Sequence, residues 1–214
     1  MMHRFSRLLA MAVLVVAGVN ARAAEPGEAD IDRLTDLVVQ AMPFGVIFEG
    51  AQAQDPKWPL GDKAANASAE QLACLRSELS SDGYRRIKRK DVVAYAKAHP
   101  ADVMDDIRLL ESGAAELFGK SVLAGAEGEA SGKAVDPETI FASASAAQGM
   151  ALTLLVTDKQ YADLRQLIGM GNMFEQIDEG GDAQAKGEEQ GAQIGAMLMI
   201  GAMATCELPM SVLQ

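Results

Sequence analysis

Two cysteines are the residues of this sequence whose chemistry is easiest to predict. Cys74 and Cys206 are the only cysteines in the 214 residues. They lie too far apart for a redox pair of the CxxC type or for a zinc knuckle. In an oxidising compartment we expect them to form a disulfide, which would close a loop of about 130 residues and stabilise the fold by roughly 5 kcal/mol. The alternative is a pair of buried free thiols.

A run of cations at residues 84–90, called the basic strip below, interrupts an otherwise acidic sequence. The chain holds 19 Lys and Arg against 30 Asp and Glu, which gives a net charge of −11. The strip could bind a phosphate, an anionic cell-envelope polymer or an acidic partner protein. Alternatively, its cations neutralise carboxylates on neighbouring helices. The members of the basic strip are Arg85, Arg86, Lys88, Arg89 and Lys90.

Carboxylates gather in the sequence close to His99. Asp102, Asp105 and Asp106 fall in the first turn of an expected helix, where acids complement the positive end of the helix dipole. They could instead hold a divalent cation, or act as paired carboxylates in a hydrolase. The only other histidine, His3, lies in a segment that we expect to be removed, which excludes a histidine-based triad and a multi-histidine metal site. The sequence predicts no cofactor.

Large apolar side chains mark two further candidate sites. Phe44 and Phe48 bracket a strongly hydrophobic aromatic segment, which we expect in the core; the alternative is an exposed patch that binds a partner. A second site would be a pocket between helices that holds an apolar ligand. Its lining would consist of Phe118, Phe141, Met197 and Met203.

The first 23 residues have the features of a secretory signal peptide. A basic start is followed by an apolar run at residues 8–19 and by small residues before an expected cleavage after Ala23. Loss of the three leader arginines changes the net charge from −11 to −14 for residues 24–214. The sequence therefore predicts a periplasmic or secreted protein with no membrane span in the mature chain. Its acidic charge argues against binding to nucleic acid.

Apolar residues at helical spacing predict an all-α fold, a single-domain bundle of about seven helices. Ile31, Leu34 and Val38 form one face of the first helix, and Ser68 with Gln71 matches a capping box at the start of the second. Residues 52–67 should form a loop, and residues 125–135 a flexible connection within one domain. The expected helices cover approximately residues 31–42, 68–80, 91–100, 102–124, 136–155, 157–168 and 187–204.

Glycines inside two of these helices indicate close contacts. Gly113 interrupts the apolar face of the helix at 102–124, which points to a close helix crossing there. Gly187, Gly191 and Gly195 recur at every fourth position of the last helix, where they would let a neighbouring helix approach.

Three functions are compatible with these features. The first is a non-enzymatic protein that binds or inhibits another envelope or secreted protein through the basic strip, Phe44 and Phe48. The second is a carrier whose apolar ligand lies between helices. The third is a carboxylate-dependent hydrolase, which the shortage of histidine disfavours.

Overall fold

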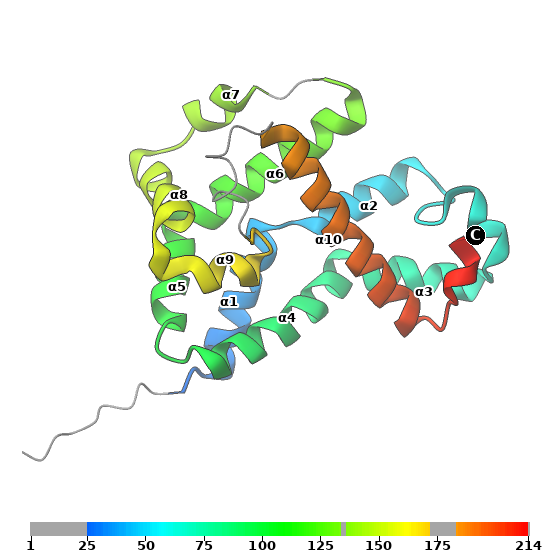
Figure 1. The fold of residues 1–214 in the computed structure, drawn as a ribbon, viewed down its shortest axis with the longest axis horizontal. Helices are drawn as coiled ribbons and strands as arrows, with labels where there is room; N and C mark the ends of the chain where they lie inside the picture. Colours follow the sequence, from blue (N-terminus) through cyan, green and yellow to red (C-terminus); the bar gives the residue numbers. More distant parts are fainter. Residues whose placement is uncertain (1–24, 134–135, 172–182, 214) are drawn as a thin grey trace, which may run out of the picture.

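The computed structural model describes residues 25–133, 136–171 and 183–213, and these residues are mostly helical (Figure 1). No strand occurs in the described ranges, so the predicted all-α class is confirmed. The ten α-helices of the described residues are α1 Glu28–Ala41, α2 Phe44–Gln54, α3 Ala69–Leu79, α4 Ser81–Ala98, α5 Val103–Leu109, α6 Ala115–Ser131, α7 Pro137–Ala142, α8 Ala146–Thr157, α9 Ala162–Ile168 and α10 Ala183–Thr205. A π-helical turn, η2 Leu110–Ala114, joins α5 to α6, and short 3-10 helices cover Gly61–Asn66, Lys159–Tyr161 and Met210–Leu213. The expected leader lies outside the described residues.

Helix α1 is the central element of the main core. It packs against α4, α5, α6 and α9. Its predicted apolar face is confirmed, because Ile31, Leu34 and Val38 are all buried. The contact with α6 is close: a Cβ placed at Gly119 would lie 2.1 Å from the carbonyl oxygen of Gln40. Only glycine therefore allows these two helices to approach to this distance.

Gly113 divides the long helix that the sequence predicts at 102–124. Its φ of 108° is left-handed and lies inside η2, so the expected single helix is observed as α5, the π-helical turn and α6. A Cβ at Gly113 would lie 2.2 Å from Cγ of Gln148, in the first turn of α8. The close helix contact expected at this glycine is therefore confirmed, and it positions α8 beside α6.

A second, smaller core joins α3 to the end of α10. The expected disulfide joins Cys74 on α3 to Cys206, the residue directly after α10. Leu75 and Met203 are buried in this cluster. Phe48 contacts both cores, so the two clusters are in contact through α2.

Several boundaries differ from the sequence-based expectation. The single helix expected at 136–155 is observed as α7 and α8, because Ser145 caps a new helix with a capping box to Gln148. Helix α4 begins at Ser81 instead of Asp91, because Ser80 Oγ accepts a hydrogen bond from the Gly83 amide and caps the helix. Helix α2 occupies residues 44–54, where no helix was expected. Helix α6 continues to Ser131, so most of the expected connection at 125–135 is helical; Gly132, with a φ of 65°, ends it.

The glycine repeat of α10 does not mark a helix contact. A Cβ at Gly187, Gly191 or Gly195 would have no neighbouring atom within 4 Å in the part of the chain that the structure describes. The expectation of a close neighbour along this stripe is therefore wrong for the described residues, because α10 packs on α3 through its C-terminal half, where Ala202 and Met203 are buried.

Within the described ranges, no single helix is long and apolar enough to cross a membrane. Helices α1 and α2, which meet at 52°, reach that length and composition only as a bent pair.

Candidate functional site

The basic strip lies on α4 and forms ion pairs with α1. Arg85 Nε lies 2.6 Å from Asp36 Oδ1, and Arg89 Nε lies 2.8 Å from Asp32 Oδ1. Arg89 also pairs with Glu28. Its hydrogen bond lowers the pKa of Asp32 below the ordinary value for an aspartate. Two cations of the strip therefore neutralise three carboxylates of the central helix.

Two more cations of the strip are paired outside α1. Arg86 Nη2 lies 2.9 Å from Glu78 Oε1 on α3, and Lys88 Nζ lies 3.2 Å from Asp91 Oδ2 on α4 itself. Lys90 is exposed and makes no ion pair with a described residue. Of the two interpretations of the strip, the geometry favours charge neutralisation between helices.

Phe44 belongs to the core instead of an exposed patch. Its side chain is buried, and its ring packs edge-on against the buried ring of Tyr84 with centroids 6.0 Å apart. Phe48 is half-buried between Phe44 and Trp58, at centroid distances of 5.8 and 5.6 Å. The four rings form a continuous aromatic row. The core interpretation therefore holds for Phe44, which offers no surface to a partner, and in part for Phe48, whereas Val46 between them is 51% exposed.

Asp106 is the one member of the carboxylate cluster that is buried, with an exposure of 2%. Its Oδ2 accepts a hydrogen bond of 2.6 Å from the Tyr95 hydroxyl. Burial raises the pKa of Asp106 to about 6; the bond from Tyr95 opposes this shift, and the charges of Asp102 and Asp105 add to it. Burial also raises the pKa of Tyr95.

His99 lies at the edge of this cluster. Its ring stacks on that of Tyr95 with centroids 4.8 Å apart, and its Nδ1 lies 3.5 Å from Asp163 Oδ2 and 3.7 Å from Asp102 Oδ2. No group of three or more His, Cys, Asp or Glu side chains in the described residues is placed to hold a metal ion. The carboxyl of Asp106, whose pKa is raised to about 6, is enclosed by protein, so this arrangement gives little support to a hydrolase.

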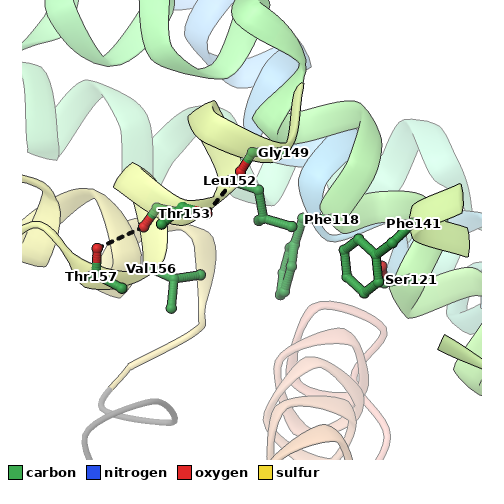
Figure 2. A pocket seen from close by; sticks show the side chains of 8 residues that line it. All are labelled: Phe118, Ser121, Phe141, Gly149, Leu152, Thr153, Val156 and Thr157. Atoms are coloured by element: carbon green, nitrogen blue, oxygen red, sulfur yellow. Dashed lines mark hydrogen bonds between the residues drawn. The ribbon is translucent and has the colours of Figure 1, made fainter. Parts of the chain in front are cut away.

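A pocket of about 620 Å³ opens between α6, α7 and α8, the three helices grouped at one side of the molecule (Figures 1 and 2). Two of its residues come from α6, one from α7 and the rest from α8. They are Phe118, Ser121, Phe141, Gly149, Leu152, Thr153, Val156 and Thr157. None of them is ionisable.

The pocket contains two of the four residues expected to line an apolar site. Phe118 and Phe141 lie in it together, and Phe141 is 46% exposed at its mouth. Met203 is buried in the second core instead, and Met197 is 64% exposed on α10. The register of α10 places these methionines elsewhere, because its buried face is directed toward α3.

Sequence reasoning missed the contribution of α8. Its Leu152 and Val156 are half-buried at the pocket, whereas Met150 and Leu154 are exposed on the surface. A helix with apolar side chains all round, outside the centre of a core, is a recognisable sign of a binding surface.

The hydroxyl groups of the pocket are bonded within their own helices. Thr153 Oγ1 donates to the Gly149 carbonyl at 2.9 Å, and Thr157 Oγ1 donates to the Thr153 carbonyl at 2.9 Å, as the dashed lines in Figure 2 mark. Ser121 Oγ donates to the Leu117 carbonyl at 3.0 Å. Ring, aliphatic and methyl carbons therefore make up most of the lining.

No protein-family model, curated protein or solved structure matches the chain. The functional argument therefore rests on the geometry of these sites alone.

Proposed function

We propose that this protein binds an apolar small molecule in the pocket between α6, α7 and α8 and acts as its carrier outside the cytoplasm. The observation that carries the proposal is the pocket itself. Its volume of about 620 Å³ is typical of small-molecule sites, and its lining is apolar with a few hydroxyls. The partial exposure of Phe141 gives a ligand a way in.

The other candidate sites are accounted for by the fold. Four of the five cations in the basic strip are paired with carboxylates, and Phe44 is buried. Asp106 is enclosed and bonded to Tyr95. The pocket, in contrast, is a concave apolar surface that no side chain of the described residues fills.

A periplasmic or secreted location is part of the same proposal. A disulfide between Cys74 and Cys206 persists in an oxidising compartment, and residues 1–23 have the composition of a cleaved leader. N-terminal sequencing of the protein from an envelope fraction tests this part: the chain should begin after Ala23. An intact leader on protein from the cytosol, with both thiols reduced, would overturn it.

The binding proposal is tested with the neutral fluorescent probe N-phenylnaphthylamine. Its emission should rise on addition of the purified mature protein. Gly149→Trp should abolish this rise, because Gly149 lines the pocket and a Cβ there meets nothing within 4 Å, which leaves room for the indole to fill the site. Gly125→Trp is the matched control, since Gly125 is also open but lies on α6 outside the pocket.

Two outcomes decide the proposal. Loss of the signal in Gly149→Trp, with retention in Gly125→Trp and equal helical content in both, supports it. A signal that survives filling of the pocket, or no signal in the unmodified protein, contradicts it. Native mass spectrometry of the protein from its own envelope gives an independent check, because a carrier should copurify with a small molecule.

A binding protein for another envelope or secreted protein is the second candidate. The exposed apolar side chains favour it: Met150, Met197 and Ile200 are 67%, 64% and 50% exposed. Met197→Asp with Ile200→Asp should then abolish capture of the partner from an envelope fraction and leave probe binding unchanged. Reversal of Arg85 and Arg89 is a poorer test, because it also breaks the ion pairs with α1.

A further inference from the structure

The eight described residues that line the pocket present hydrogen-bond acceptors to a ligand but no free side-chain donor, and from this we infer the class of its ligand. We propose that the ligand is an uncharged lipophile whose polar group donates hydrogen bonds, with a long-chain alcohol as its simplest member. This inference rests on the proposed function and makes it specific.

The hydroxyl protons of the pocket are already used within the helices. A hydroxyl has one proton to donate and two lone pairs that accept. Thr153, Thr157 and Ser121 each give their proton to a backbone carbonyl four residues earlier in the same helix. Their oxygens retain lone pairs that can accept a bond from a ligand. The threonine methyl groups and the neighbouring Leu152 and Val156 supply apolar contact.

The backbone around the pocket offers no donor in compensation. In the interior of an α-helix each amide donates to the carbonyl four residues earlier, so the amides of the pocket-lining stretch of α8 are already used. The Gly149 carbonyl accepts from the Thr153 hydroxyl in addition to its helical bond. A carboxylate, phosphate or ketone oxygen placed here would therefore lose its bonds to water without replacement.

The charges of the protein also disfavour the binding of an anionic ligand. None of the eight lining residues is ionisable, and the chain as a whole carries a net charge of −11. The pocket also extends to Thr157 at the C-terminal end of α8, where the helix dipole is negative. An ammonium group could donate to the hydroxyl oxygens, but burial of its charge among Phe118, Leu152 and Val156 would be costly.

Competition among ligands of one chain length tests the inference. The competitors are decanol, decanoate and the methyl ketone of the same length. Each is titrated against bound N-phenylnaphthylamine at a pH where decanoate is ionised. Decanol should displace the probe at a concentration at least about ten-fold lower than decanoate and several-fold lower than the ketone.

A pair of matched variants locates the acceptor. Thr153→Val keeps the shape of the side chain and removes the hydroxyl lone pairs, so it should reduce the advantage of decanol over the ketone to about two-fold or less. Thr205→Val is the control, because Thr205 donates to the Gly201 carbonyl in the same manner on α10, outside the pocket. This control should retain the full advantage.

The outcomes separate the two levels of the proposal. Displacement by decanoate or the ketone at the same or a lower concentration than decanol overturns the ligand class and leaves the pocket as a binding site. A preference that is unchanged when Thr153→Val is combined with Thr157→Val and Ser121→Ala, which removes all three hydroxyl acceptors, also overturns the ligand class. Probe fluorescence that persists in Gly149→Trp overturns the proposed function, and the ligand class with it.

Discussion

Asp106 should make this protein less stable as the pH rises, whereas the carboxylates that form ion pairs make it less stable as the pH falls. Burial raises the pKa of Asp106 from 3.8 to about 6 in the folded protein. The folded state therefore holds this proton more tightly than the unfolded chain. The stabilising contribution of protonated Asp106 is complete below about pH 4 and is lost as the pH rises through about 6. The shift corresponds to a loss of up to about 3 kcal/mol.

The substitution Asp106→Asn isolates this contribution. Asparagine is neutral at every pH, and its Oδ1 can still accept the hydrogen bond that Asp106 receives from Tyr95 at 2.6 Å. The free energy of unfolding of the wild type should therefore fall relative to that of Asp106→Asn by up to about 3 kcal/mol between about pH 4 and about pH 8. Urea unfolding followed by circular dichroism measures both proteins across this range.

The comparison between variants is needed because other carboxylates titrate in the same range. Hydrogen bonds from Arg89 and Lys120 lower the pKa of Asp32 and of Glu116, which makes the protein less stable as the pH falls. These contributions cancel in the difference between wild type and variant when the sites are distant and independent. Asp62→Asn is a control for the removal of one carboxylate at the surface, because the side chain of Asp62 is 96% exposed.

One result would refute the reasoning about Asp106. If the difference between wild type and Asp106→Asn is constant between about pH 4 and about pH 8, or grows in favour of the wild type, burial does not govern this carboxyl group. Tyr95→Phe gives a second check. Since the Tyr95 hydroxyl lowers the pKa of Asp106, its removal should shift the loss of stability to a higher pH.

Three further predictions concern the packing of the fold. Reduction of the disulfide, or replacement of Cys74 and Cys206 by serine, should lower the free energy of unfolding by up to about 5 kcal/mol, and equal stability with and without reductant would contradict this. Gly113→Ala should lower the free energy of unfolding by at least about 2 kcal/mol, because Gly113 has a positive φ and contacts α8. Gly125→Ala, in contrast, should stabilise α6 by about 1 kcal/mol. Equal effects of the two substitutions in thermal melts would show that Gly113 is not constrained. Tyr84→Phe should leave the stability unchanged or raise it by about 1 kcal/mol, because the buried Tyr84 hydroxyl has no partner among the described residues; a clear loss in urea unfolding would mean that this hydroxyl is bonded.

Much of the secondary structure could be predicted from the sequence, because it depends on residues only a few positions apart in the chain. The apolar spacing of Ile31, Leu34 and Val38 predicted α1, and the pair of Ser68 and Gln71 predicted the capping box that begins α3. Gly113 was recognised as a close contact from its place inside an apolar face. The π-helical turn at this glycine was not foreseen, because it depends on the way α8 packs against it.

The start of α4 shows where local patterns failed. Five cations at residues 85–90 give no apolar face of their own, so a helix was expected only from Asp91 onward. In the folded protein four of these five cations are paired with carboxylates of α1, α3 and α4. Without that partner surface the sequence does not distinguish a neutralised helix face from a binding site for anions.

The sequence by itself determined the helical class, the two cysteines available for pairing and the starts of α3, α5 and α7, since each follows from residue type and from spacings of three or four. Tertiary structure alone decided that Phe44 and Asp106 are buried, that the basic strip faces acids some fifty positions away, and that Phe118 and Phe141 meet at one pocket while Met203 does not. These outcomes depend on the angles and distances at which whole helices pack. Such geometry arises from many weak contacts between remote segments, and no short stretch of sequence records it.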